Sequence, residues 1–273
     1  MTRFRTLFDA PLPVVGAIRL PPLPDRPGSP GIDAIVRFAL EEFRALADGG
    51  ADGALIVNEH DVPHRVRAQP ETISAMNRVA RALGERNSVL VLGCQILLND
   101  PIASLAVART SGLDFIRCDH FVDPMERADH GVMVLDPDGL IAFRAEIDAD
   151  DILVLADIQV RRSTMIEERS LRDSAREAGL HRADAIIVTG PDTGSAPSAD
   201  DLRDARAGID DSGAGVPLLL GGGLDADNVQ ELLPLADGAI VGSGISANDR
   251  IDADAVGRLM ETVARLRAAR STE

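Results

Sequence analysis

The sequence contains no lysine, no tryptophan and no tyrosine, and it has only two cysteines. Without lysine, no side-chain amine can form a Schiff base, so lysine-dependent aldolases and enzymes that hold pyridoxal phosphate on a lysine are excluded. The cysteines, Cys94 and Cys118, lie in apolar runs and form neither a disulfide framework nor a CxxC metal pair. We therefore expect two buried, unreactive thiols.

A long hydrophobic run and a secretory leader are also missing. No segment approaches the roughly 18 apolar residues that suggest a membrane-spanning helix. Residues 1–9 contain no extended apolar stretch with a small-residue cleavage site. We therefore expect a cytoplasmic protein with no segment inserted in a membrane.

The charge that is present is mostly negative. All 28 basic residues are arginine, 44 residues are acidic, and the formal net charge is −16. Such a surface repels nucleic acid and anionic lipid, so neither is expected as a partner over a broad surface. An anionic ligand would therefore need a local pocket of arginine side chains or backbone N–H groups. A GC-rich genome and a salt-adapted proteome both remain open as the origin of this composition.

Short apolar, β-rich runs alternate with amphipathic helical stretches, which is the pattern of parallel βαβ units. The expected strands are 13–20, 52–59, 89–97, 114–121, 152–160, 184–190, 217–223 and 238–245. The expected helices are 32–48, 70–83, 100–111, 137–147, 170–178, 199–209, 226–235 and 253–268. Eight such units predict an α/β fold in which residues 1–273 form a single (β/α)8 TIM barrel. The alternatives are an open doubly wound sheet overall and a hairpin through Asp138-Gly139 in place of helix 137–147.

Carboxylates follow several of the expected strands, where barrel enzymes carry their reactive groups. Glu59, Asp119 and Asp157 each end an apolar strand, where desolvation raises a carboxyl pKa and a nearby arginine lowers it. These three are the predicted acid–base residues. The alternative is an ion pair with Arg117 or Arg161 that only braces the end of the barrel.

Other polar residues at the strand ends are candidates for contacts with a substrate. Because side chains alternate along a strand, Asp157, Gln159 and Arg161 are expected on one face. The predicted substrate-binding residues are Arg19, Asn58, Asn99, Arg117, Gln159, Arg161 and Thr189.

Glycine-rich segments end the last two expected strands. Glycine lets backbone N–H groups approach an anion, and a following helix N-terminus adds favourable partial charge. The pattern predicts a phosphate site, and tight turns without a ligand are the alternative. The predicted phosphate-binding residues are Gly221, Gly222, Gly223, Gly242, Ser243 and Gly244. A further loop, 189–195, would either cover a ligand with Thr193 or Ser195 as donor or form an ordinary capped turn.

Acidic and histidine residues also cluster after the second and fourth strands. Such oxygen and imidazole groups can hold a divalent cation. The residues concerned are Glu59, His60, Asp61, His64, Asp119 and His120. Their spacing matches no strong metal motif, so no metal ligand and no cofactor are predicted, and a divalent cation remains the alternative.

Seven segments, taken in order, resemble the BtpA family, also called BtpA/SgcQ. They are GAIRLPPLP (16–24), DGALIVNEHDVP (52–63), ILLNDPIA (96–103), DFIR (114–117), LADIQVRR (155–162), DAIIVTGPDTG (184–194) and DGAIVGS (237–243). The resemblance covers nearly the whole chain and implies a TIM-type barrel. The family labels of photosystem I or membrane-complex biogenesis imply a role in assembly.

The chain departs from the family pattern at three places. Family members usually have histidine where Arg19 stands, and a His-Val-Lys-His run where residues 159–162 read Gln-Val-Arg-Arg. An asparagine-rich end of the fourth strand is replaced by Cys118-Asp119-His120. If the family histidines are catalytic, these changes imply altered or lost chemistry in this chain.

Two functions are therefore carried forward. The first is an enzyme acting on a small phosphorylated metabolite, a sugar phosphate or nucleotide, by lyase, isomerase, hydrolase or transferase chemistry. The alternative is a non-catalytic assembly or biogenesis factor for a membrane protein complex. The sequence leaves the oligomeric state open, including a homo-oligomer.

Overall fold

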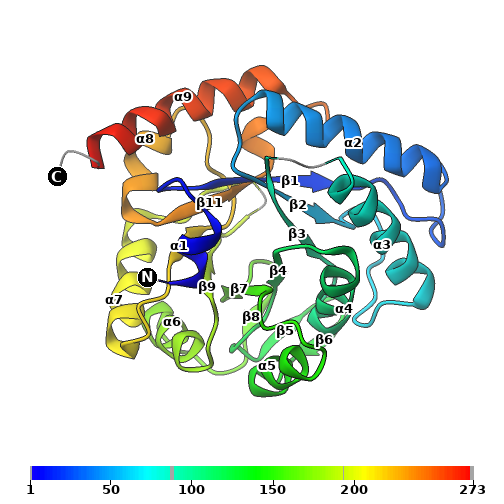
Figure 1. Cartoon of the computed structure of the whole chain (residues 1–273). Helices are drawn as coiled ribbons and strands as arrows, with labels where there is room; N and C mark the ends of the chain where they lie inside the picture. Colours follow the sequence, from blue (N-terminus) through cyan, green and yellow to red (C-terminus); the bar gives the residue numbers. More distant parts are fainter. Residues whose placement is uncertain (1, 87–88, 193, 271–273) are drawn as a thin grey trace.

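The computed structural model describes residues 2–86, 89–192 and 194–270. Eight parallel strands close into a barrel in the order β1-β11-β10-β9-β7-β4-β3-β2, with helices around the outside (Figure 1). The barrel strands are β1 (Val14–Arg19), β2 (Gly53–Val57), β3 (Val91–Gln95), β4 (Phe115–Cys118), β7 (Leu153–Ile158), β9 (Ala185–Val188), β10 (Leu218–Leu220) and β11 (Gly238–Val241). The predicted (β/α)8 TIM barrel is confirmed.

The helices that cover the barrel follow the predicted amphipathic stretches. They are α2 (Ile32–Asp48), α3 (Pro70–Gly84), α4 (Pro101–Ser111), α5 (Pro137–Glu146), α6 (Leu171–Leu180), α7 (Ala199–Ser212), α8 (Val229–Leu232) and α9 (Ala253–Arg270). Helix α5 replaces the alternative hairpin, because the Asp136 side chain accepts the Gly139 N–H at 3.0 Å and caps the helix. None of the described helices is long and apolar enough to cross a membrane.

One expected helix is much shorter than predicted. Residues 226–235 form only the four-residue α8 and a 3-10 turn, η1 (Leu233–Leu235). Pro234 lacks the N–H that a continuing α-helix needs. A long helix dipole behind the seventh strand, which the sequence suggested, is therefore not available to an anion.

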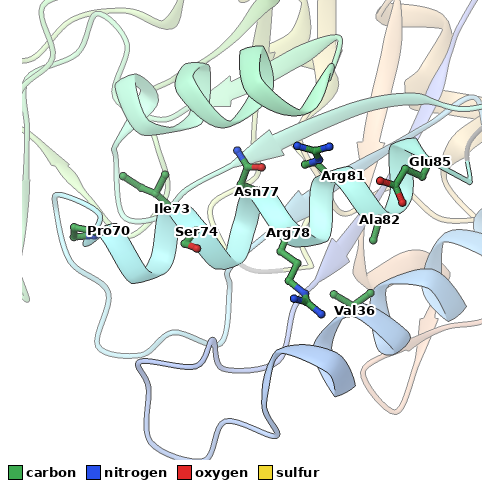
Figure 2. Close-up of a pocket in the computed structure, with 9 residues that line it drawn as sticks. All are labelled: Val36, Pro70, Ile73, Ser74, Asn77, Arg78, Arg81, Ala82 and Glu85. Carbon is green, nitrogen blue, oxygen red and sulfur yellow. The ribbon is translucent and has the colours of Figure 1, made fainter.

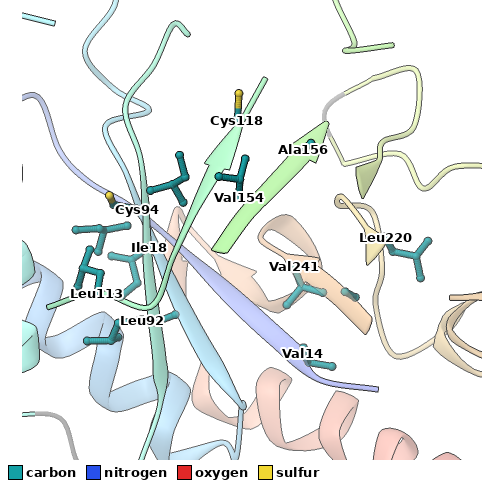
Figure 3. Packing of buried hydrophobic residues seen from close by; sticks show 14 of the residues in the cluster. Val14, Ile18, Leu92, Cys94, Leu113, Cys118, Val154, Ala156, Leu220 and Val241 are labelled. Carbon is teal, nitrogen blue, oxygen red and sulfur yellow. The ribbon is translucent and has the colours of Figure 1, made fainter. Parts of the chain in front are cut away.

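The hydrophobic core has two layers. Alternate strand residues such as Leu55, Phe115 and Ile187 fill the inside of the barrel, and the others pack under the helices. Figure 3 shows part of the outer layer, including Cys94 and Cys118, which are both buried and unpaired thiols as expected. A Cβ at residue 93 would overlap the Phe115 ring, so glycine on β3 makes room for this large side chain inside the barrel.

The N-terminal end of the barrel is closed by an unpredicted helix, α1 (Arg3–Leu7). Its Phe4, together with Phe8 just after it, packs on the inner core. Four aspartates also hold this end together, because each lies just before one barrel strand and accepts the N–H of the first or second residue of the preceding barrel strand. The bonds are Val14 to Asp52 (2.7 Å), Leu92 to Asp114 (2.8 Å), Val154 to Asp184 (2.9 Å) and Leu218 to Asp237 (2.9 Å).

The opposite, C-terminal end carries two small antiparallel additions. Strands β5 (Met125–Arg127), β6 (Gly131–Met133) and β8 (Thr164–Met165) form a three-stranded sheet, and β12 (Ser246–Ala247) pairs with β13 (Arg250–Ile251). The sequence predicted only a connection at 122–136, because strands of two or three residues are too short to show a period. This small sheet brings Arg127 over the end of the barrel.

Candidate functional site at the barrel mouth

A cavity of about 370 Å3 lies at the C-terminal end of the barrel, and every barrel strand contributes to it. The residues at or just after the strand ends are Arg19 (β1), Val57 (β2), Gln95 (β3), Arg117 (β4), Asp157 (β7), Thr189 (β9), Gly221 (β10) and Val241 (β11). Substrates of barrel enzymes bind at this end. We call this cavity and its lining the barrel mouth.

A second, larger cavity of about 800 Å3 lies elsewhere, on the outer surface between α2 and α3. Figure 2 shows that its lining comes from the helix surfaces, with Val36 on α2 facing Arg78 on α3. Arg78 is already paired with Asp33 at 2.6 Å. This groove shares no residue with the barrel mouth and gathers no carboxylates for chemistry beyond Glu85.

The deepest charged group of the mouth is a buried ion pair. Arg117 donates from Nε and Nη2 to the two oxygens of Asp157, both at 2.7 Å. Burial opposes the charge on the guanidinium, but the Asp157 carboxylate outweighs it and holds the pKa of Arg117 above its ordinary value. Such a bidentate pair fixes both side chains. Asp157, predicted as an acid–base residue, therefore has both of its oxygens engaged in bracing β4 against β7.

Asp119 is the carboxylate that keeps an available oxygen in the mouth. Its Oδ1 accepts a hydrogen bond from Gln95 Nε2 at 2.8 Å, and Asp119 forms no ion pair with another described residue. Burial raises the pKa of Asp119, and the nearby Arg117 and Arg161 oppose that rise. Glu59 lines the same cavity and likewise has no ion pair among the described residues. These two carboxylates are placed to accept protons or hydrogen bonds from a ligand.

Arg161 follows β7 and lies beside the glycines. A Cβ on Gly222 would be 3.7 Å from Arg161 Nη1. Burial, followed by repulsion from Arg117, lowers the pKa of Arg161, and the described residues offer it no hydrogen bond or ion pair. An anion bound here would offset both the burial of the Arg161 charge and its repulsion from Arg117.

The glycine loops form the wall next to Arg161. Gly222 and Gly223 have φ values of 131° and 70°, which favour glycine, and they line the mouth together with Gly221, Gly242 and Ser243. Thr189 lines it as well, and its buried hydroxyl has no partner among the described residues. Thr193 lies outside the described residues, whereas neighbouring Gly194 approaches Ser243: a Cβ there would be 3.4 Å from Oγ.

Four residues that the sequence placed in the site do not line the mouth. Gln159 has a φ of 44°, which ends the strand alternation, and its amide donates to Ser174 and to the Arg169 carbonyl. Gly244 packs so tightly on the Leu224 carbonyl that a Cβ would not fit. These two positions therefore support neighbouring elements and do not contact the cavity.

The two asparagines are also turned away from the cavity. Asn58 accepts the Leu97 N–H at 2.8 Å and donates to Asp61 at 3.1 Å, so it ties the β2 and β3 ends together. Asn99 is buried just before α4, outside the lining. The sequence could not separate them from Arg19 or Glu59, because all of them follow apolar strands.

The mouth also contains arginine and histidine side chains that were not among the substrate-binding residues predicted from the sequence. Arg127 reaches it from β5, Arg162 follows Arg161, and His60 and His64 come from the loop after β2. Arg127 is held by Asp129 through two hydrogen bonds of 3.0 Å. For Arg127, the only available signal was a positive charge inside the long connection 122–136.

The histidine and acidic cluster does not assemble as a set of metal ligands. His60 Nδ1 contacts the Leu20 carbonyl at 2.8 Å, His64 Nε2 contacts the Glu59 carbonyl at 3.1 Å, and Asp61 accepts the Leu23 N–H at 2.8 Å. Across residues 2–86, 89–192 and 194–270, no three His, Cys, Asp or Glu side chains are grouped to hold a metal ion.

Fold and site together define a (β/α)8 barrel with an arginine-lined cavity at the C-terminal ends of its strands. The sequence matches the BtpA family over residues 11–265, and the chain belongs to that family. It is 33% identical over 273 residues to the Synechocystis protein named photosystem I biogenesis protein BtpA, with 97% of this chain and 92% of that protein aligned. A protein of Archaeoglobus fulgidus is 30% identical over 247 residues, covering 90% of this chain and 96% of its own.

Solved structures with a similar fold are barrel enzymes. Phosphoribosyl anthranilate isomerase from Thermotoga maritima superimposes with a TM-score of 0.58 and 17% identity, covering 93% of this chain and 99% of the enzyme. Thiamine phosphate pyrophosphorylase from Pyrococcus furiosus gives 0.57 and 16%, covering 96% and 98%. At these identities the likeness establishes the fold alone.

Proposed function

We propose that this BtpA-family protein is an enzyme that binds a small phosphorylated metabolite in the barrel mouth. The observation that carries the proposal is the position of Arg161, whose guanidinium lies beside Gly222 and has no hydrogen bond or ion pair among the described residues. Ser243 and the Thr189 hydroxyl line the same wall. A phosphate group carries about −1.5 to −2 charges and accepts several hydrogen bonds. It would therefore supply the negative charge and the acceptors that these donors lack among the described residues.

The expected chemistry takes place beyond the phosphate, at Asp119 and Glu59. With Asp157 held by Arg117, these two carboxylates are the proposed acid–base pair. Isomerase or lyase chemistry by proton transfer fits two carboxylates without a lysine. The names of the barrel neighbours, phosphoribosyl anthranilate isomerase and thiamine phosphate pyrophosphorylase, lend support because both describe phosphorylated compounds.

The direct test is a thermal-shift screen of phosphorylated metabolites, followed by calorimetry with inorganic phosphate. A ligand at ~100 times its Kd stabilises the folded chain by roughly 2.7 kcal/mol. Gly222→Asp places a carboxylate at the proposed phosphate position and is expected to abolish the shift. Gly215→Asp is the matched control, since Gly215 also has a positive φ of 62° but lies in open space away from the mouth.

The thermal-shift and binding test has three distinguishable results. A shift that Gly222→Asp removes and Gly215→Asp keeps supports the proposed site. No shift over a broad panel, with and without divalent cations, would contradict it. Binding that survives in Gly222→Asp would place the phosphate elsewhere.

A second candidate function is an assembly factor that uses the barrel as a binding platform. It is supported by the name of the Synechocystis relative and by exposed apolar side chains on the small β5–β6–β8 sheet region, where Val132, Val134 and Ile166 are 61%, 63% and 49% exposed. Replacing all three by serine should abolish a stable protein complex in this case, and should leave phosphate binding unchanged if the enzyme proposal is correct.

A further inference from the structure

The two walls of the barrel mouth differ in what they offer a ligand. The strands β10 and β11, which carry the glycine loops, lie across the closed barrel from β3 and β4. The wall at β10 and β11 presents the glycine loops, and Arg161, which follows β7, reaches Gly222 on this wall. The wall at β2 to β4 presents the carboxylates of Glu59 and Asp119. A ligand whose phosphate lies at the glycines therefore points its other end at these two acids.

The acids on the far wall have unused acceptor capacity. Asp119 receives one hydrogen bond, from Gln95, and neither Asp119 nor Glu59 is part of an ion pair among the described residues. An ionised carboxylate accepts hydrogen bonds and has none to donate. Hydroxyl groups on the ligand would satisfy these oxygens, whereas a second negative group would face them.

The arginines near the far wall already have counter-charges. Arg117 is held by Asp157, and Arg127 is held by Asp129 through two bonds of 3.0 Å. Arg19 lies 3.5 Å from Asp249. A second anionic group near any of these three arginines would therefore compete with a carboxylate that already neutralises it. Arg161 is already engaged by the first phosphate in the proposed function.

From this asymmetry we propose that the substrate is a phosphate monoester whose other end carries hydroxyl groups and no second negative charge. The proposal rests on the phosphate site of the proposed function and adds the substrate class. It favours phosphorylated sugars and polyols, and nucleoside monophosphates, over phosphorylated carboxylic acids and bisphosphates. A mouth of about 370 Å3 lies within the range of small-molecule sites.

The test is calorimetric binding of matched probes to the full chain. Glycerol 3-phosphate and 3-phosphoglycerate share a three-carbon skeleton and differ in a terminal hydroxymethyl or carboxylate group. Ribitol 5-phosphate and ribulose 1,5-bisphosphate extend the comparison to five carbons, and inorganic phosphate reports the phosphate site alone. We expect both polyol phosphates to bind more tightly than inorganic phosphate. Their doubly anionic counterparts should bind roughly tenfold more weakly or worse, because like charges repel across the mouth.

Charge-removing variants identify the source of the selectivity. Asp119→Asn and Glu59→Gln keep the side-chain shapes and are expected to reduce the tenfold preference toward parity, mainly by improving 3-phosphoglycerate binding. Asp200→Asn removes the same charge from an exposed site on α7 and should leave the preference unchanged. Equal unfolding temperatures of the variants would show that the changes do not come from misfolding.

Each outcome bears on the proposal. Tight binding of 3-phosphoglycerate or the bisphosphate, equal to the polyol phosphates, would overturn the substrate class. So would polyol phosphates that bind no better than inorganic phosphate, although the phosphate site would then still stand. Failure of inorganic phosphate and of every ester to bind would overturn both this inference and the proposed function.

Discussion

The two ends of the barrel use the same residue types in opposite ways. At the N-terminal end, Asp184 and Asp237 each accept hydrogen bonds from a backbone N–H group and from arginine side chains, as in the 2.6 Å bond from Arg144 to Asp184. At the C-terminal end, Asp119 and Arg161 share a cavity without pairing to each other. Satisfied charges stabilise a fold, while unsatisfied charges cost stability and are available to a ligand.

The largest expected effect is on stability, at the N-terminal end. Asp184→Ala removes the acceptor of the Val154 N–H and of two arginines, Arg144 and Arg3. The Arg144 side chain is only 8% exposed, so it would lose its 2.6 Å counter-charge while buried and keep only the more distant Asp150 carboxylate at 3.9 Å. We expect a loss of about 3 kcal/mol or more in the free energy of unfolding, measured with denaturant.

The matched control for that variant is Asp200→Ala. Asp200 also pairs with an arginine, Arg203, but its side chain is 92% exposed. Such surface pairs contribute roughly 0–1 kcal/mol. Equal losses in the two variants would contradict the idea that the N-terminal aspartates hold the barrel closed.

The next effect is on binding, at the C-terminal end. Arg161→Met is expected to weaken inorganic phosphate binding roughly tenfold to hundredfold, as the loss of hydrogen bonds from a charged group predicts. The free energy of unfolding should stay equal or rise, because burial already opposes the Arg161 charge and lowers its pKa. Calorimetry and denaturant unfolding measure the two quantities. Arg203→Met, on exposed α7, controls for the loss of a positive charge.

A smaller effect is expected on the pH dependence of the free energy of unfolding, through Asp237 at the N-terminal end. Burial opposes ionisation of Asp237, but the Leu218 N–H and Arg206 outweigh it, so the pKa of Asp237 lies below its ordinary value. A depressed carboxyl pKa stabilises the fold fully above the unfolded value of about 3.9, and the contribution disappears as pH falls through the folded value. Asp237→Asn should therefore destabilise the chain by about 1 kcal/mol at neutral pH. The difference in free energy of unfolding between the variant and the parent chain should shrink below pH ~4. A difference that stays constant there would show that ionisation of Asp237 does not stabilise the fold.

The contrast also explains which features could be predicted from the sequence. The barrel strands are apolar runs with helices between them, and burial enforces that pattern at every unit. The aspartate clamp was visible as Asp before each of four strands, at positions 52, 114, 184 and 237, yet its partners lie one strand earlier and only the closed barrel brings them together.

At the mouth, prediction was limited by the direction of side chains just beyond the strands. Gln159 and Arg161 were expected on one face, but the positive φ of Gln159 ends the alternation and directs its amide toward Ser174. Arg127 reaches the mouth on a three-residue strand, which is too short to show a periodic pattern in the sequence. Strand ends can therefore be located from sequence, whereas the turns after them are set by tertiary contacts.

The smallest expected effect reverses the sign of the first. Burial raises the pKa of Asp119, so keeping this carboxyl ionised at neutral pH costs free energy in the folded chain. A raised carboxyl pKa destabilises the fold as pH rises above the unfolded value of about 3.9. Asp119→Asn keeps an acceptor for Gln95 and removes that cost, so we expect a gain of about 0.5 kcal/mol at neutral pH, together with loss of the proposed activity. A clear loss of stability instead would mean that Asp119 helps to hold the barrel together, as the N-terminal aspartates do, and would remove the reason for assigning it to the chemistry.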